Sequence, residues 1–285
     1  MAEEAYAPTP STIFNRYKER GTYDAETIHN IFNTTSVVHV SFLPTPDDPF
    51  PVILPMVGMI GTFPGDSAAE PACYLHGYVS SRLMKLSNEH TPVPNGNSNG
   101  NGSTTSSPSS STPPGLPVCV TATKVDGFKL TLTAFGHSYN YRSALVQGHA
   151  TIVSDAAEKM WALQLVTDGV LPGRWEHLRG VPDAGELAAT RVIKVKIAAA
   201  SAKVSASVPA DKRKDANNDE RAGNVWVGVV PAYEAFGEPV PAPHNRVDAV
   251  PEFISDFVKN ENENAEEYAV WAAGNVPGKK KTEEE

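Results

Sequence analysis

The chain of 285 residues has a formal net charge of -9 and is 40% hydrophobic, which is enough apolar content for a sizeable buried core. The acidic balance excludes a general affinity for nucleic acid or anionic membranes, and no apolar run reaches membrane-spanning length. Residues 1–10 lack a secretory pattern, and the two cysteines, Cys73 and Cys119, lack metal-ligand spacing, so we expect a cytoplasmic protein with reduced thiols.

The N-terminal part predicts one helix and two strands after a flexible lead-in, residues 1–15. A suitable N-cap and apolar residues at helical spacing predict a helix over residues 24–33. β-branched and apolar runs then predict strands over residues 37–42 and 51–60. The second strand contains Pro55, which has no N–H to donate. It therefore marks an edge strand, a bulge or a ligand-facing turn, of which we favour the edge.

Residues 72–85, ACYLHGYVSSRLMK, combine a strand with the start of a helix. Ser80 or Ser81 is a suitable N-cap, and Arg82 and Lys85 fall within the first turn and a half. A helix N-terminus presents unpaired N–H groups and a partial positive charge, so cations and hydroxyls beside it make a candidate phosphate site. The alternative is an ordinary capped helix with solvated basic residues.

Residues 91–115 form a low-complexity tract of Asn, Gly, Ser, Thr and Pro with almost no apolar side chains. Such a segment cannot offset the entropy lost on ordering, so we expect a disordered insertion. Alternating apolar residues then predict a strand over residues 118–124. The pair Asp126-Gly127 predicts a hairpin turn, with the chain returning through residues 128–135.

The rest of the chain alternates strand patterns with helix patterns. A polar and aromatic segment, residues 137–143, leads into a strand over residues 144–153. A helix is predicted over residues 155–168, with Ser154 as its N-cap and Gly169 as its end. Later elements are strands over residues 191–197 and 224–230, a solvated loop over residues 210–223, and a helix over residues 250–258.

About seven short strands, two or three helices and no βαβ alternation predict a mainly β (α+β) fold. We expect an antiparallel β-barrel with peripheral helices. We assign residues 16–245 to this domain, with the low-complexity tract as an insertion, and residues 246–285 to a C-terminal helix and an acidic tail.

Four stretches in this order resemble one family: CYLHGYVSSRLMK, HSYNYRSALVQG, ELAATRVIKVKI and WVGVVP. Together they resemble the flavin-nucleotide-binding branch of the pyridoxamine 5'-phosphate oxidase-related family, which includes nitroimidazole-resistance proteins. The resemblance covers residues 17–241 outside the low-complexity tract. It implies an FMN-binding split β-barrel that acts on a small molecule and forms a homodimer, with FMN held in clefts at the dimer interface.

The resemblance also implies the cofactor-binding residues. Ser81 and Arg82 match the serine-arginine pair that binds the phosphate, and Trp226 resembles a late tryptophan near the cleft. For His76 and Trp226 a core position remains the alternative. The implied FMN-binding residues are Pro55, Met56, Val57, His76, Ser81, Arg82, Lys85, Ser138, Tyr141, Arg142, Ser143 and Trp226, with Asn140 as a minor contact.

Two functions follow from such a site. In an FMN-dependent oxidoreductase the flavin carries out the redox chemistry, so no protein acid or base is required and we predict no catalytic residue. The same residues would serve a flavin carrier or sensor without turnover. Oxidation of pyridoxamine phosphate itself is disfavoured, because the chain after Pro231 is proline-rich and then acidic and lacks that enzyme's C-terminal substrate-binding pattern.

A haem or metal binder is the third possibility, since related split barrels include haem-handling proteins. His76, His137 and His149 are the residues that would have to converge. Their spacing matches no recognised ligand pattern, so we predict no metal site.

Overall fold

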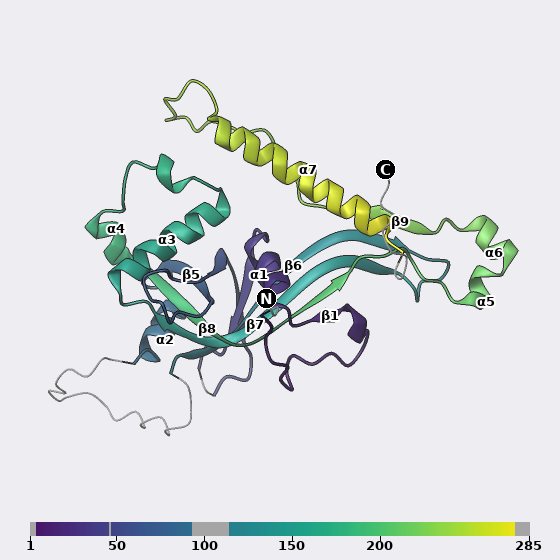
Figure 1. Cartoon of the computed structure of the whole chain (residues 1–285), viewed down its shortest axis with the longest axis horizontal. Coiled ribbons are helices and arrows are strands. Elements are labelled where there is room, and N and C mark those ends of the chain that lie inside the picture. The colour runs from purple at the N-terminus through teal and green to yellow at the C-terminus, as the bar shows by residue number, and fades with distance from the viewer. Residues whose placement is uncertain (1–3, 46, 93–113, 277–285) are drawn as a thin grey trace. The chain divides into compact units, whose positions relative to one another are not determined.

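The computed structural model describes residues 4–45, 47–92 and 114–276, and their strands form one nine-stranded antiparallel sheet (Figure 1). Strands neighbour one another in the order β3-β2-β6-β7-β8-β5-β4, with β1 beside β8 and β9 beside β6. The two ends of this path, β3 (Val52–Met56) and β4 (Gly58–Gly61), are separated in the chain by Val57 alone. The sheet therefore curves back on itself without closing. The predicted mainly β fold with peripheral helices is confirmed.

Three strands are longer than predicted: β6 (Leu116–Leu130), β7 (Ser138–Ile152) and β8 (Thr190–Ser205). The hairpin predicted at Asp126-Gly127 is wrong, because β6 runs through both residues. Asp126 is buried and pairs with Arg142, while Gly127 pairs with Pro231 on β9. Partners on distant segments thus override a local turn signal. Of the predicted insertion, residues 93–113 lie outside the described residues.

The chain forms two compact units. Unit 1 comprises Met1–Ile13, Tyr23–Ala122 and Leu145–Ser201, and unit 2 comprises Phe14–Thr22, Thr123–Ala144 and Ala202–Glu285. The strands β6, β7 and β8 each contribute residues to both units. This division does not test the predicted domain boundaries.

In unit 1, helix α1 (Ala25–Asn33) begins as the sequence predicts. The Asp24 side chain accepts a hydrogen bond from the backbone N–H of Thr27 at 2.7 Å, which caps the helix. The helix is fixed to β4 by Asn33, whose side chain exchanges two hydrogen bonds with the backbone of Ile60. The other elements confined to unit 1 are β2 (Val38–Phe42), β5 (Ala72–Tyr78), α2 (Arg82–Glu89), α3 (Ala156–Val170), η2 (Trp175–His177) and α4 (Ala184–Ala189).

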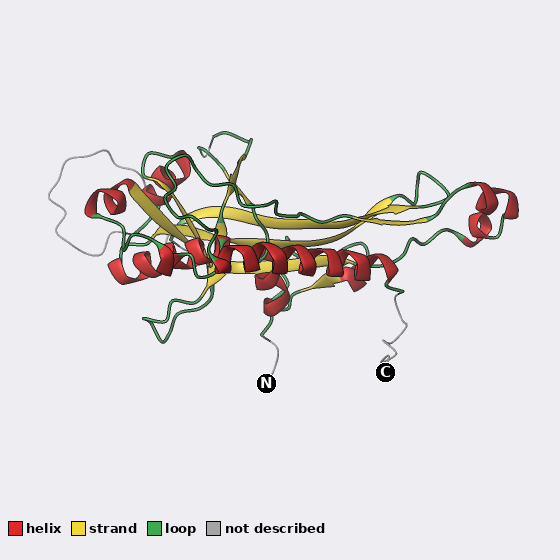
Figure 2. Ribbon diagram, turned by 90° about the horizontal axis from the view of Figure 1, so that it is seen from above, coloured by secondary structure: helices red, strands yellow, loops and turns green. Residues whose placement is uncertain are grey.

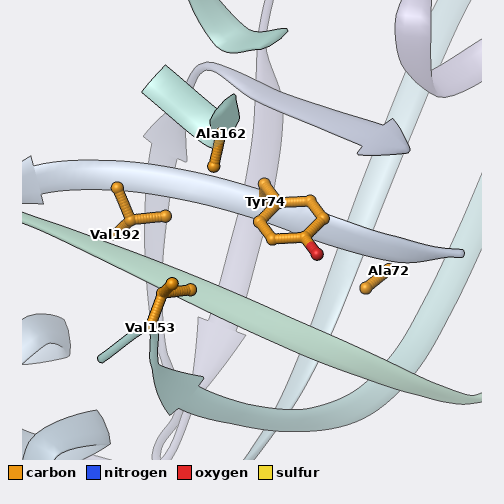
Figure 3. Close-up of a cluster of buried hydrophobic side chains, with 5 residues drawn as sticks. All are labelled: Ala72, Tyr74, Val153, Ala162 and Val192. Atoms are coloured by element: carbon orange, nitrogen blue, oxygen red, sulfur yellow. The ribbon is translucent and has the colours of Figure 1, made fainter. Parts of the chain in front are cut away.

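A buried cluster joins α3 to one face of β5 and β8. Figure 3 shows its members, Ala72, Tyr74, Val153, Ala162 and Val192. The Tyr74 ring packs edge-on against Trp161, and its hydroxyl donates to Glu158 at 2.7 Å. Glu158 also accepts from Lys194 at 2.7 Å, so the polar atoms at the edge of the cluster are paired. These contacts hold α3 against the strand that carries His76.

The start and end of α3 differ from the prediction. Its N-cap is Asp155, not Ser154, because the Asp155 carboxylate accepts from the backbone N–H of Glu158 at 2.7 Å. Gly169 lies inside the helix and does not end it. A Cβ atom at Gly169 would lie 2.4 Å from the Cε of Met59, so glycine is needed there for the close approach of α3 and β4.

Unit 2 contains η1 (Lys18–Arg20), β1 (Gly21–Thr22), α5 (Arg213–Ala216), α6 (Asp219–Asn224), β9 (Gly228–Pro231) and α7 (Glu252–Gly274). The loop predicted over residues 210–223 is wrong in part, because α5 and α6 lie within it. Each is shorter than two turns, and so short a helix leaves no periodic pattern in the sequence. Strand β9 is shorter than the predicted strand over residues 224–230.

Helix α7 extends over 23 residues, far beyond the predicted residues 250–258, and is one unbroken helix (Figure 2). Its buried residues are Ala269 and Ala272, and the carbonyl of Ala272 accepts from the Asn140 side chain at 3.0 Å. Because small alanines form this contact, no wide apolar stripe marks the second half of the helix in the sequence. In the described ranges no helix combines the length and hydropathy needed to cross a membrane.

Candidate functional site

The N-terminus of α2 carries the predicted phosphate-binding residues. Ser81 is the N-cap, and its hydroxyl makes no capping hydrogen bond. Arg82 and Lys85 are exposed, and neither forms an ion pair within the described part of the chain. A free hydroxyl and two free cations therefore lie beside the unpaired N–H groups of the helix, an arrangement that suits an anion. Phosphate binding here stays a prediction.

The end of β3 lies close to the strand that leads into α2. A Cβ atom at Gly77 would lie 3.0 Å from the Cε of Met84 and 3.9 Å from the Cε of Met56. Pro55 is exposed on β3, and β3 is the last strand on its side of the sheet, so the predicted edge position is confirmed. Val57 is half-buried between β3 and β4. The structure thus brings Met56, but not the side chain of Pro55, to the corner between β5 and α2.

His76 lines a cavity of about 390 Å³ in unit 1. Side chains alternate along a strand, so His76 shares the α3-facing side of β5 with Tyr74. The other walls come from α3, η2 and α4 and are largely apolar, with Leu163, Trp175 and Leu187 among them. The imidazole remains accessible, and the interpretation of His76 as a core histidine is wrong.

The surroundings of His76 favour its neutral form. Burial lowers the pKa of its imidazole below the usual value, and in the described residues no carboxylate forms an ion pair with it. The charged residues of this cavity, Arg179 and Glu186, pair with each other. A neutral imidazole in an apolar cavity can act as a hydrogen-bond partner or as a metal ligand.

Arg142 in unit 2 is already paired inside the protein. Its guanidinium donates to both carboxylate oxygens of Asp126, at 2.6 and 3.1 Å, and lies 3.7 Å from the centre of the Tyr268 ring. The two charged side chains are only 17% and 4% exposed. Any phosphate bound by Arg142 would have to compete with Asp126, and the predicted role of Arg142 remains a prediction.

The other predicted residues of unit 2 differ in accessibility. Ser143 is half-buried and donates to the carbonyl of Lys203 at 3.2 Å, and Tyr141 is half-buried. Trp226 is 65% exposed, and its ring covers the backbone of Gly228, so the interpretation of Trp226 as a core residue is wrong. Ser138 is exposed and lines a second cavity.

The three histidines considered as metal ligands do not form a metal centre. In the described residues no group of three or more His, Cys, Asp or Glu side chains is placed to hold a metal ion. The nitrogen Nδ1 of His137 lies 3.1 Å from the carbonyl of Thr133 in unit 2, whereas His76 and His149 belong to unit 1.

A basic cavity in unit 2 was missed in the sequence. Its volume is about 910 Å³, and its charged lining consists of five cations and two carboxylates. The cations come from three separate segments and are Arg16, Arg20, Lys129, Lys212 and Lys214. The basic character of residues 16–20 and 212–214 is visible in the sequence, but their convergence on Lys129 is not.

Comparisons with known proteins identify relatives of the whole fold. The sequence profile described as pyridoxamine 5'-phosphate oxidase matches residues 101–204. The flavocytochrome Anf3 from Azotobacter vinelandii is 30% identical, with a TM-score of 0.65, over 88% of this chain and 98% of its own. The FAD and haem binding protein from Mycobacterium smegmatis is 25% identical, with a TM-score of 0.62, over 84% of this chain and 97% of its own.

More distant matches include a candidate 5-nitroimidazole antibiotic resistance protein from Bacteroides thetaiotaomicron. It is 17% identical, with a TM-score of 0.42, over 65% of this chain and 86% of its own. A search of curated protein sequences finds no match.

Proposed function

Because the chain belongs to the pyridoxamine 5'-phosphate oxidase-related family, we propose that it is a flavin-dependent oxidoreductase acting on a small molecule. The observation that carries the proposal is the likeness to a flavocytochrome along nearly the whole length of both chains. A flavin carrier or sensor without turnover is the alternative, since it needs the same binding residues.

The α2 N-terminus fits a flavin phosphate. Ser81 keeps a free hydroxyl, and Arg82 and Lys85 are exposed without ion pairs in the described residues. When bound, a flavin supplies hydride and electron transfer, so this chain's residues need only hold its phosphate and orient its ring. FMN is the form that the sequence resemblance implies. The FAD of the similar mycobacterial protein makes the dinucleotide the form that we favour.

Haem beside the flavin is the second candidate, and His76 is the observation that favours it. Its neutral imidazole would be available to hold a haem iron from a largely apolar cavity, and two similar proteins are described as a flavocytochrome and as a FAD and haem binding protein. The residues that line this cavity include no second histidine, cysteine or methionine. Haem would therefore have one protein ligand from this cavity.

Absorption spectra of the purified full-length protein test both candidates. We expect a flavin spectrum, and chromatography of the heat-released cofactor would separate FAD from FMN. A colourless protein that takes up neither flavin would contradict the central proposal. Anaerobic mixing with NADH or NADPH then separates enzyme from carrier, because a nicotinamide-dependent oxidoreductase would bleach the flavin.

Haem binding is tested by His76→Ala. We expect a Soret band in the haem-loaded wild type and its loss or shift in the variant, with the flavin spectrum retained. His90→Ala is the matched control, since His90 is exposed at the end of α2 and lies outside this cavity. An unchanged Soret band in His76→Ala would remove His76 as the ligand.

We also propose a cytoplasmic homodimer. For the dimer, strand β3 at the edge of the sheet has Ile53 60% exposed, and Phe50 before it is 77% exposed, which suits a surface covered by a second copy. For the cytoplasmic location, both cysteines are free thiols, and burial raises the pKa of the Cys73 thiol to about 12, so this thiol is unreactive. Light scattering of the purified protein would measure the oligomeric state.

A further inference from the structure

The basic cavity of unit 2 has the features of an anion-binding site. It lies between the segment around η1, the end of β6 and the segment that leads into α5. The lining of this cavity of about 910 Å³ includes five cationic side chains and two carboxylates. The whole chain is acidic, with a net charge of -9, so the positive charge of this cavity is opposite in sign to the net charge of the protein.

Lys129 is the central observation. It is only 5% exposed, and its ammonium donates to the hydroxyls of Ser205 at 3.0 Å and Ser207 at 2.7 Å. No carboxylate forms an ion pair with it in the described residues, and no third acceptor takes its remaining N–H. Buried charges in proteins are normally paired, so neutral hydroxyls alone leave the positive charge uncompensated.

Burial, aided by the nearby Arg20, lowers the pKa of Lys129 to about 8. The ammonium form therefore predominates at neutral pH, although its surroundings disfavour it. An anion in the cavity would supply the missing charge.

Two arginines of the cavity, Arg16 and Arg20, lie beside the ring of Tyr17. The guanidinium carbons of Arg16 and Arg20 are 4.7 and 4.3 Å from the centre of the Tyr17 ring. Tyr17 adopts the left-handed backbone conformation, with φ 53° and ψ 55°, which is costly for a residue other than glycine. In the described residues neither arginine pairs with a carboxylate. Both guanidinium groups thus remain available to a ligand.

The cavity also offers an aromatic surface. Phe135 lines it with 95% of its surface exposed, and the ammonium of Lys212 lies 5.9 Å from the centre of its ring. Exposed rings beside cations are suited to stacking with a planar base. The cavity is too large for an inorganic phosphate alone.

We propose that this cavity binds a nucleoside diphosphate, either free or as part of a dinucleotide. Lys129 and the two arginines hold the diphosphate, and Phe135 stacks against the base. The dinucleotide is either FAD, bound in this cavity and not at the α2 N-terminus, in which case the inference rests on the proposed function, or a nicotinamide dinucleotide that reduces the flavin.

Isothermal titration of the full-length protein with ADP at fixed ionic strength tests this proposal. We expect saturable binding that inorganic pyrophosphate displaces and adenosine does not. The variant Lys129→Met, of similar length but without charge, should weaken ADP binding at least tenfold. The matched control is Lys18→Met, which removes the same charge from an exposed residue outside the cavity and should leave the affinity within twofold.

Lys212→Met is the second variant, because Lys212 is exposed and we expect its replacement to leave the fold intact. It should weaken ADP binding severalfold. No binding of ADP at millimolar concentration, or equal affinities in the wild type and both cavity variants, would overturn the proposal.

Loading with FAD separates the two sources. If FAD occupies the cavity, FAD-loaded protein no longer binds ADP, and Lys129→Met loses FAD but keeps FMN. If a nicotinamide dinucleotide occupies it, FAD-loaded protein still binds ADP, and NADH displaces it. A yellow protein that fails to bind ADP with and without FAD would overturn this inference alone, whereas a colourless protein that binds ADP would overturn only the proposed function.

Discussion

The two basic sites of this protein differ in how far their positive charges are removed from water, and therefore in the free energy needed to keep them charged. At the α2 N-terminus of unit 1, Arg82 and Lys85 are exposed, and water solvates them at little cost. In the basic cavity of unit 2, Lys129 is buried with only two hydroxyl partners. A buried cation without a counter-charge is energetically unfavourable, so Lys129 is a stronger indication of a bound anion than the exposed residues of α2. Only the α2 site was visible in the sequence.

Arg142 supplies the internal reference for this comparison. It is also a poorly exposed cation of unit 2, but its charge is balanced by a bidentate pair with Asp126. A buried cation that serves structure is expected to look like Arg142, with a carboxylate at hydrogen-bond distance. Lys129 lacks that partner, and substitutions at the two positions should have opposite effects on stability.

The largest effect is expected for Arg142→Met. It leaves the Asp126 carboxylate buried without a partner, and we expect the free energy of unfolding to fall by about 3–5 kcal/mol, measured by urea denaturation. Arg179→Met is the control, since the Arg179 pair with Glu186 is exposed to solvent and should contribute little. A small loss for Arg142→Met would mean that Asp126 is solvated and that the pair does not stabilise unit 2.

Lys129→Met should act in the opposite direction. The folded pKa of about 8 lies below the ordinary value of 10.5, so folding disfavours the charged form. Removing the charge should raise the free energy of unfolding of the ligand-free protein near pH 7. Relief of the buried charge contributes up to about 3 kcal/mol, and the loss of the two hydrogen bonds to Ser205 and Ser207 subtracts from this gain. Urea denaturation in nucleotide-free buffer would measure it. A clearly destabilised Lys129→Met would indicate a structural role.

The pH dependence gives a second measurement on the same residue. Below pH 8 Lys129 is protonated in both the folded and the unfolded protein, so the wild type loses the full free energy of burying the ammonium group. Between pH 8 and 10.5 the unfolded state binds more protons than the folded state, so wild-type stability rises with pH relative to Lys129→Met. The difference between the two proteins should therefore shrink across this interval. A difference that stays constant would contradict the lowered pKa.

At the exposed site, Arg82→Ala should change binding and not stability. We expect flavin affinity to fall by about 1.5–3 kcal/mol, the usual contribution of a hydrogen bond to a charged group, measured by flavin fluorescence. The free energy of unfolding without flavin should stay within about 0.5 kcal/mol of the wild type, as for most surface substitutions. Unchanged flavin affinity would remove Arg82 from the site.

The sequence predicted the fold where local signals agree with tertiary contacts. Helix α1 has its cap and its apolar stripe within one segment, so both could be predicted. The predictions failed where distant partners decide the structure. Asp126-Gly127 has the composition of a turn, but Arg142 and Pro231 hold both residues in a strand. Helix α7 packs through alanines, which leave no stripe to recognise.

The same distinction explains the sites. Ser81, Arg82 and Lys85 lie within five consecutive residues and could be grouped by inspection. The basic cavity is assembled from residues that are far apart in the chain, and Lys129 occupies a buried position of β6, where a charged residue is rarely found. Burial of its ammonium is a tertiary property, and no pattern of sequence spacing predicts it.

The smallest effect, at Ser81, separates capping from ligand binding. An N-cap serine usually stabilises its helix by about 1 kcal/mol through a hydrogen bond from its hydroxyl, but the Ser81 hydroxyl makes no such bond. Ser81→Ala should therefore change the free energy of unfolding by less than about 0.5 kcal/mol in the absence of flavin. Flavin affinity should fall by about 0.5–1.5 kcal/mol, because the hydroxyl is then unavailable to the phosphate. A variant that loses stability but binds flavin normally would identify Ser81 as a cap alone, and the α2 N-terminus would lose one of its three ligand groups.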